Sequence, residues 1–223
     1  MATADFFAPG IRPYTDREEV LHALTHGAAV PVAVMAATLL LLRAEGGAQV
    51  TSAAIYGASM VALYVASTLY HATWRSQRQA LFRTIDHAAI YLKIAGTYTP
   101  MTLIALPPGP GIALLSVIWL LAAGGIGVKL ARRGRPADVV YERLSLAFYL
   151  AMGWVGILAI GPIFAALGPG GFAWLMAGAG CFTVGAAIYA QQRWVYNHLA
   201  WHLFVLAGSA CHFVMVWRVM GTA

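Results

Sequence analysis

The chain has 223 residues, of which 61% are hydrophobic and only 10% are charged, and its mean hydropathy is +0.72. Soluble globular domains carry about 25% charged residues, so this composition excludes that class and predicts an integral membrane protein. The formal net charge of +6 comes from short loops between apolar runs, so it indicates membrane topology and not a nucleic-acid partner.

Seven apolar runs follow one another along the chain, each close to the roughly 20 residues that cross a bilayer. They predict an all-α, polytopic membrane protein whose seven transmembrane helices cover residues 20–42, 50–73, 84–105, 111–130, 144–164, 171–190 and 197–219. No linker divides the chain, so we expect residues 1–223 to form a single domain. Residues 1–19 lack the apolar core of a cleaved signal peptide and are expected to form a cytoplasmic segment.

The distribution of Lys and Arg sets the predicted orientation. One side of the membrane receives the N-terminus and the loops after the second, fourth and sixth spans, with Arg12, Arg17, Arg75, Arg78, Arg83, Lys129, Arg132, Arg133, Arg135, Arg143 and Arg193. The other side holds only Arg43 and Arg218. Because cytoplasmic loops carry the excess of positive charge, we expect the N-terminus in the cytoplasm and the C-terminus outside.

Three histidines in apolar surroundings predict a metal site. His198 and His202 lie four residues apart at the start of the seventh span and share one helix face, and His71 ends the second span. The predicted topology places all three near the cytoplasmic face. Since an ionisable side chain inside a membrane is costly without a partner, we expect them to bind one Zn²⁺ ion and to leave its fourth position open.

Two further residues are candidates for catalysis beside this site. Asp86 begins the third span at the same depth, and Ser67 lies one turn before His71 on the same helix face. Zinc activates water and polarises carbonyl groups, and a carboxyl group in an apolar site can transfer the proton to a leaving group. The predicted reaction is therefore hydrolysis of an amide or ester bond in a membrane lipid. Ser67 could instead bond to its own helix backbone.

The remaining polar residues near the spans are candidates for supporting the site or lining its cavity: Glu18, Glu19, His22, His26, His87, Lys93 and His212. The two glutamates either belong to the site or interact with the positive end of the first helix dipole. His22 and His26 are also four apart, so they form a rival metal pair or line the entrance.

Two of these candidates lie deeper in the membrane. His212 is about 15 Å deeper than His202, too far to bind the same ion, so it fits a hydrogen-bonded interior histidine. His87 fits the same interpretation. Lys93 either pairs with an acid or extends toward the interface.

Three motifs resemble those of the bacterial hemolysin III proteins, which belong with the progestin and adipoQ receptors, including the adiponectin receptors. They are STLYH at 67–71, RTIDH at 83–87 and HLAWH at 198–202, and the resemblance extends over residues 18–212. It implies a seven-helix protein of the bacterial plasma membrane with zinc near the cytoplasmic side. The positions that match the family's zinc ligands, its acid and its serine are His71, His198, His202, Asp86 and Ser67.

The resemblance also suggests a function. The superfamily includes alkaline ceramidases, which favours zinc-dependent hydrolysis of a ceramide-like lipid, and its bacterial members are linked with membrane lipid homeostasis. His22 stands where these proteins usually carry Asn, which predicts a polar role beside the site. The alternatives are a receptor or membrane-state sensor with structural zinc, and a pore-forming hemolysin or channel. Membrane lipids are the expected partners, and nothing in the sequence indicates an oligomeric state.

Overall fold

The computed structural model describes residues 13–135, 138–191 and 194–221, and these residues form helices and no strand. The α-helices are α1 (Asp16–Arg43), α2 (Gly46–Ala72), α3 (Gln79–Pro100), α4 (Pro108–Ala131), α5 (Val139–Trp154), α6 (Ile160–Ala190) and α7 (Asn197–Val219). A π-helix, Met101–Ala105, follows α3, and a 3₁₀-helix, Val155–Ala159, joins α5 to α6. The predicted all-α class is confirmed. Arg12 and Arg193, which contribute to the predicted orientation, lie outside the described residues.

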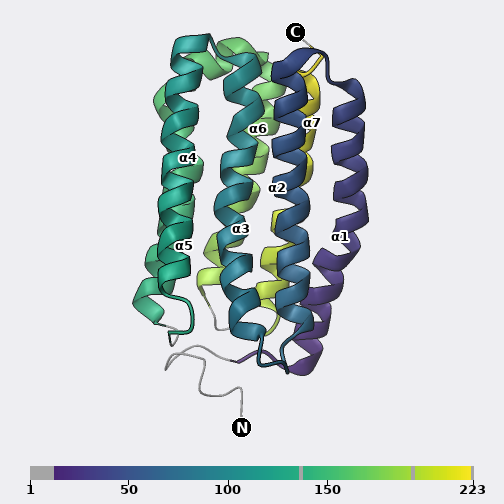
Figure 1. Ribbon diagram of the computed structural model, residues 1–223, viewed down its shortest axis with the longest axis vertical. Coiled ribbons are helices and arrows are strands. Elements are labelled where there is room, and N and C mark those ends of the chain that lie inside the picture. The colour runs from purple at the N-terminus through teal and green to yellow at the C-terminus, as the bar shows by residue number, and fades with distance from the viewer. Residues whose placement is uncertain (1–12, 136–137, 192–193, 222–223) are drawn as a thin grey trace.

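The helices form one elongated bundle (Figure 1). Helix α1 packs against α2, α2 against α3, α3 against α4, and α6 against α7, and α7 returns to pack against α1. The start of α1 lies at the lower end of Figure 1 and the end of α7 at its upper end. The starts of α3 and α7 and the end of α2 also lie at the lower end, so residues far apart in the sequence meet there.

Local capping fixes where the chain enters the bundle. The backbone N–H of Glu18 donates to Thr15 Oγ1 at 3.3 Å, and the backbone N–H of Thr15 donates to Glu18 Oε2 at 2.9 Å. This reciprocal pair satisfies two backbone donors that a helix start would otherwise leave unpaired. Asp138 caps α5 in a similar way, since its carboxylate accepts from the N–H of Val140 at 2.9 Å. Both helices therefore begin at defined residues of the lower end.

The bundle is apolar outside and contains polar groups inside. Leu158 and Leu42 are 85% and 80% exposed, whereas Glu18 and His71 are fully buried. Exposed apolar surface on this scale indicates contact with a membrane. Helices α1, α2, α4 and α7 and the continuous segment Val139–Ala190 are long and apolar enough to cross one. Helix α3 is not among them because it carries several charged residues, and we conclude that the chain is a membrane protein.

The segment Val139–Ala190 contains two of the predicted spans, 144–164 and 171–190. Gly168 separates them, with φ 62° and ψ 174°. A positive φ is disfavoured for residues that have a Cβ atom, and Pro169 follows directly. Helix α6 therefore consists of two helical segments that meet at Gly168, between the two predicted spans.

Candidate metal centre

Histidines from α2 and α7 converge near the lower end of the bundle. His198 Nε2 lies 3.1 Å from His71 Nε2 and 3.0 Å from His202 Nε2. The one-turn spacing on α7 places His198 and His202 on the same face, and the last turn of α2 presents His71 to them. All three residues are buried. The structure thus places His71 and His202 beside His198, whose Nε2 contacts a ring nitrogen of each.

The spacing of these nitrogens fits a metal ion. In a tetrahedral zinc site with Zn–N distances of 2.0–2.1 Å, two ligand nitrogens lie about 3.3 Å apart. The two measured separations, 3.0 and 3.1 Å, are close to that value. Uncharged imidazole nitrogens are also the donors that zinc and other late transition metals prefer.

A fourth histidine, His22 of α1, enlarges the set of possible ligands. His22, His71 and His198 each offer a ligand atom, and these atoms all lie within 4.8 Å of one another. This buried group could therefore hold a metal ion. The sequence predicts only a polar role for His22, although its four-residue spacing from His26 marks a rival pair. His202, the third ligand that the sequence predicts, is not part of this group, so the two candidate triads share His71 and His198 and differ in His22 or His202.

Glu19 determines which nitrogen of His71 is available. Its Oε2 lies 2.6 Å from His71 Nδ1 and 4.0 Å from His22 Nδ1. The short contact is a hydrogen bond that His71 donates through Nδ1–H, so the lone pair of Nε2 points toward His198. A carboxylate in this position orients a metal-binding imidazole and increases its basicity. Of the two roles considered for Glu19, the contact with His71 favours membership of the site over a role limited to the α1 dipole.

Glu18 connects α1 to the start of α7. Its Oε1 accepts a hydrogen bond from the backbone N–H of Tyr196 at 3.1 Å. Tyr196 precedes α7 and has a left-handed backbone, with φ 65°. The contact fixes the backbone two residues before His198, so Glu18 helps to position that histidine.

His26 and Ser67 form a second contact between helices beside the cluster. His26 Nδ1 lies 2.8 Å from Ser67 Oγ. The His26 ring stacks on His202, with centroids 3.7 Å apart and planes inclined by 5°. Ser67 and Asp86 both line the cavity beside the cluster. Ser67 thus connects α2 to α1 at the edge of the histidine cluster.

Tyr14 lies just before α1 and packs on the same cluster. Its ring centroid is 5.0 Å from that of His22 and 5.0 Å from that of His198. Burial raises the pKa of its hydroxyl group well above the usual value, so the phenol is neutral at neutral pH. Tyr14 therefore contributes an uncharged aromatic contact to the histidines.

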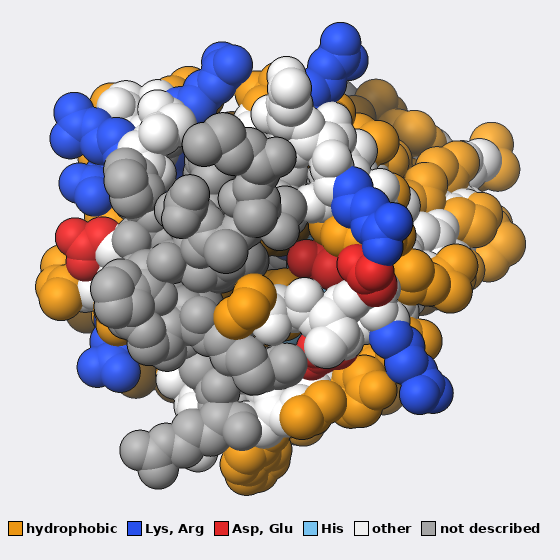
Figure 2. Space-filling model, turned by 90° about the horizontal axis from the view of Figure 1, so that it is seen from below, with side chains coloured by type: hydrophobic (Ala, Val, Ile, Leu, Met, Phe, Trp, Pro, Cys, Tyr) orange, Lys and Arg blue, Asp and Glu red, His pale blue; other side chains and the backbone are white. Residues whose placement is uncertain are grey.

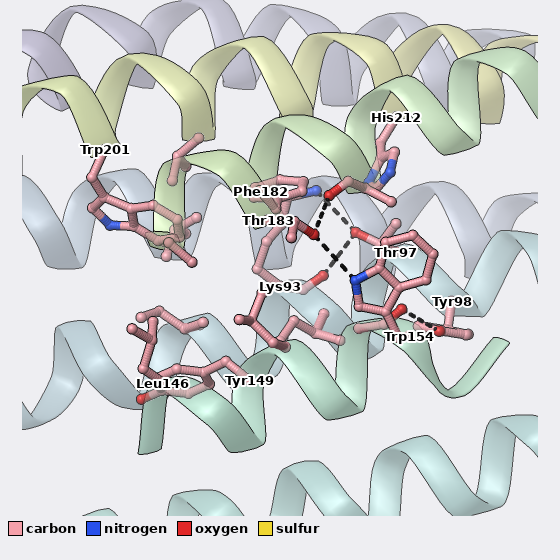
Figure 3. Close-up of a pocket in the computed structure, with 18 of the residues that line it drawn as sticks. Lys93, Thr97, Tyr98, Leu146, Tyr149, Trp154, Phe182, Thr183, Trp201 and His212 are labelled. Atoms are coloured by element: carbon pink, nitrogen blue, oxygen red, sulfur yellow. Dashed lines mark hydrogen bonds between the residues drawn. The ribbon is translucent and has the colours of Figure 1, made fainter. Parts of the chain in front are cut away.

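One cavity begins at this cluster and continues toward the middle of the bundle. Its polar lining near the cluster comprises His26, Ser67, Asp86, His198 and His202. Its deeper walls are mostly apolar and come largely from α5 and α6 (Figure 3). The arrangement places a carboxyl group, a hydroxyl group and two of the candidate metal ligands at one end of an apolar chamber.

His87 follows Asp86 in the sequence but belongs to a different group. His87 Nδ1 lies 3.3 Å from Lys129 Nζ and 3.8 Å from Glu142 Oε2. Lys129 also donates to Ser145 Oγ at 3.1 Å. His87 therefore lines the cavity while its ring joins a charged group of α4 and α5.

His212 and Lys93 lie deeper in the cavity. His212 donates from Nε2 to the carbonyl oxygen of Leu175 at 3.2 Å, as an interior histidine would. Lys93 donates from Nζ to Thr97 Oγ1 at 3.1 Å, and its Nζ lies 4.2 Å from the centroid of the Tyr56 ring. Of the two interpretations of Lys93, pairing with an acid is wrong for the described residues, because none of their carboxylates lies within ion-pair distance of it.

Comparison with known proteins identifies the family of the chain. Residues 14–213 match the family described as Haemolysin-III related. The chain is 40% identical over 203 residues to Hemolysin-3 of Bacillus cereus, covering 90% of each chain. It is 39% identical over 206 residues to the Hemolysin-3 homolog of Bacillus subtilis (strain 168), covering 91% of this chain and 94% of the relative. The human Monocyte to macrophage differentiation factor is 26% identical over 210 residues, covering 91% of this chain and 84% of the relative. The chain therefore belongs to the hemolysin III family, within the progestin and adipoQ receptor superfamily.

Proposed function

We propose that this protein is a zinc-dependent hydrolase that cleaves amide or ester bonds of ceramide-like lipids at the cytoplasmic leaflet, and that it contributes to membrane lipid homeostasis. One observation carries the proposal: the ring nitrogens of His71, His198 and His202 converge beside a cavity that also contains the Asp86 carboxyl group. The apolar walls of that cavity suit the hydrocarbon chain of a lipid. Membership of the hemolysin III family is consistent with this proposal.

Each residue of the cluster has a distinct role in the proposed reaction. His71, His198 and His202 would hold one Zn²⁺, which would supply a Lewis acid for water activation and carbonyl polarisation. Glu19 orients His71. Asp86 accepts a proton from the attacking water and returns it to the leaving nitrogen or oxygen as the bond to the carbonyl carbon breaks. Ser67, which is hydrogen-bonded to His26 and lines the same cavity as Asp86, would orient an incoming carbonyl group.

We further propose seven membrane spans, with the N-terminus in the cytoplasm, in the plasma membrane of a bacterium. The start of α1 and the end of α7 lie at opposite ends of the bundle (Figure 1), as an odd number of spans requires. Figure 2 shows Lys and Arg side chains around the edge of the lower end. Since cytoplasmic faces carry the excess of positive charge, this end faces the cytoplasm, and the histidine cluster lies in the inner leaflet.

Hydrolysis can be tested on purified protein with ceramide, using fatty acid release as the measurement. Asp86→Asn is expected to lower the rate at least about 100-fold at equal zinc content, because general acid–base catalysis contributes about 10²–10⁴-fold. Asp138→Asn is the matched control, since it removes an exposed acid that does not line the cavity. Unchanged release in Asp86→Asn would contradict the role of Asp86. No release from ceramide or from esters with the same acyl chain would favour a receptor or sensor with structural zinc.

The name of one relative, Hemolysin-3 of Bacillus cereus, favours a pore as the second candidate function. Liposomes that contain the purified protein and a trapped dye test this possibility. We expect dye release equal to that of protein-free liposomes, because the deeper walls of the cavity are mostly apolar. Release that increases with protein content would support the pore instead.

A further inference from the structure

The connection between α4 and α5 carries more positive charge than the described acids around it neutralise. Between residues 129 and 143, the described residues include five cations and two acids: Lys129, Arg132, Arg133, Arg135, Arg143, Asp138 and Glu142. Glu142 lies 3.0 Å from Arg83 and 3.8 Å from Lys129, and Asp138 caps the start of α5. Arg132, Arg133 and Arg135 have no acid within ion-pair distance in the part of the chain that the structure describes. Because arginine stays protonated in proteins, these three side chains carry a permanent positive charge.

Arg132 is the member of this group that the fold holds in place. Its Cζ lies 4.2 Å from the centroid of the Tyr141 ring, which belongs to the first turn of α5. Its carbonyl oxygen accepts the N–H of Arg135 at 3.1 Å and closes a turn in which Gly134 has φ 77°. A positive φ at this position of a turn favours glycine. Stacking occupies the face of the guanidinium group and leaves the N–H donors at its edge for a ligand.

Tyr141 adds a second hydrogen-bond donor next to this guanidinium group. Its hydroxyl group is buried and has no hydrogen-bond partner among the described residues. A buried polar group without a partner is costly, so this hydroxyl group favours a bound group that accepts from it. Since Arg132 lies over the same ring, one small group with several oxygen atoms can accept from both residues. A phosphate group has this form, and arginine binds phosphate with two parallel hydrogen bonds.

The surface beside these residues is apolar, which favours a lipid as the source of the phosphate. Leu130 in the last turn of α4 and Val140 in the first turn of α5 are 55% and 65% exposed. Leu144, one turn further along α5, is 64% exposed. Lys and Arg side chains lie around the edge of this end of the bundle (Figure 2), where lipid headgroups meet the protein. Basic groups at the end of a transmembrane helix attract anionic headgroups, and the exposed apolar side chains beside them suit acyl chains.

We propose that the end of α4 and the start of α5 form a binding site for an anionic phospholipid, with Arg132 and Tyr141 as the ligands of its phosphate group. The guanidinium group of Arg132 donates to two phosphate oxygens, and the Tyr141 hydroxyl group donates to the same phosphate. The acyl chains lie against Leu130 and Val140. These four residues do not line the cavity that begins at the histidine cluster. The site is therefore separate from the proposed hydrolysis and does not depend on it.

Equilibrium binding of radiolabelled phosphatidylglycerol to the full-length protein in a neutral detergent tests the proposal. Arg132→Gln is expected to weaken this binding about tenfold or more, the loss typical of one hydrogen bond to a charged group. Arg132→Lys keeps the charge but not the paired donors, so it should recover only part of the affinity. Arg78→Gln is the matched control, because it removes an exposed arginine from the connection between α2 and α3 at the same end of the bundle. Equal weakening in Arg78→Gln and Arg132→Gln would overturn the site, since binding would then follow net charge alone.

The Tyr141 hydroxyl group is tested by Tyr141→Phe, which keeps the ring under Arg132. We expect this variant to bind phosphatidylglycerol several-fold more weakly, and unchanged binding would overturn the paired site. Phosphatidylcholine with the same acyl chains is the comparison lipid, because it places a cation beside its phosphate, which the surrounding arginines disfavour. Equal affinity of the wild-type protein for the two lipids would also overturn the proposal, and this comparison needs no variant.

Two further arms identify what is bound and where. Glycerol phosphate carries the phosphate without acyl chains, so an excess of it should leave most of the phosphatidylglycerol bound. Complete displacement would overturn a lipid as the ligand and assign the site to a soluble phosphate. Treatment with a metal chelator should leave binding unchanged, because Arg132 and Tyr141 lie outside the cavity of the histidine cluster. Loss of binding on chelation would place the lipid at the histidines and overturn this site.

Discussion

His71 of α2 donates a 2.6 Å hydrogen bond from Nδ1 to Oε2 of Glu19 on α1, and both side chains are buried. The bond holds the His71 ring in one tautomer, with its Nε2 lone pair facing His198. It also ties the first helix to the second at the depth of the histidine cluster. The orientation of the His71 ring beside α7 therefore depends on a residue of α1.

Removal of this carboxylate is expected to weaken metal binding. Glu19→Ala should lower zinc affinity about 10–100-fold, the usual effect of losing a partner that orients a metal-binding histidine. Glu19→Gln keeps a hydrogen-bond acceptor and should lose less. Competition with a zinc-chelating dye measures both variants, and Glu45→Ala, which removes an exposed acid, is the control. Equal affinity of Glu19→Ala and the wild type would contradict the role of Glu19.

The two candidate triads can be distinguished by single substitutions. His202→Ala is expected to abolish stoichiometric zinc binding, because His202 Nε2 lies only 3.0 Å from His198 Nε2. His22→Ala should retain zinc, because the resemblance to the hemolysin III motifs assigns the third ligand to His202, although His22 also offers a ligand atom within 4.8 Å of those of His71 and His198. Metal content per protein, measured by mass spectrometry after gel filtration, decides between them. Zinc retained in His202→Ala and lost in His22→Ala would assign the ligand role to His22.

The sequence predicts most helix positions because the thickness of the membrane fixes their length. The predicted span 144–164 is an exception, since it crosses the end of α5, the 3₁₀-helix and the start of α6. The sequence also predicts that His198 and His202 share a face, since helical periodicity alone determines this. The hydrogen-bond partner of His71 cannot be predicted in this way. Glu19 lies 52 residues away, and their contact depends on how α1 packs against α2, which no periodicity encodes.

Burial of single charges is equally hard to predict. Lys129 counts among the positive loop residues in the sequence, yet it is 4% exposed, and its Nζ lies 3.8 Å from Glu142 Oε2. From the sequence, Lys93 is expected either to pair with an acid or to extend toward the membrane interface. In the structure its side chain is buried and has no acidic partner among the described residues. Both outcomes depend on side-chain packing between helices, so the apolar pattern of each helix carries no signal for them.

Helices α2 and α3 pack closely at Gly96, so we expect a larger residue at this position to lower the stability of the protein. A Cβ atom at Gly96 would lie 2.7 Å from Ser59 Cβ and 3.3 Å from the carbonyl oxygen of Ile55. Gly96→Ala should therefore destabilise the protein by about 1–3 kcal/mol, as overpacking does. Gly124→Ala on α4 is the control, because a Cβ atom there meets nothing within 4 Å and alanine favours helix. Thermal unfolding in detergent measures both, and equal stability of the two variants would contradict the close approach.

Reporter fusions in a bacterial host test the proposed membrane orientation. Alkaline phosphatase, which is active only outside the cytoplasm, should be active when fused to the C-terminus, whereas green fluorescent protein fused there should stay dark. Green fluorescent protein placed after residue 135, in the connection between α4 and α5, should fluoresce, because Arg132, Arg133 and Arg135 hold this connection in the cytoplasm. The opposite result at the C-terminus alone would indicate an even number of spans. Opposite results at both positions would show that the protein has the inverted orientation. The histidine cluster would then lie in the outer leaflet, where the proposed hydrolase would meet a different set of lipids.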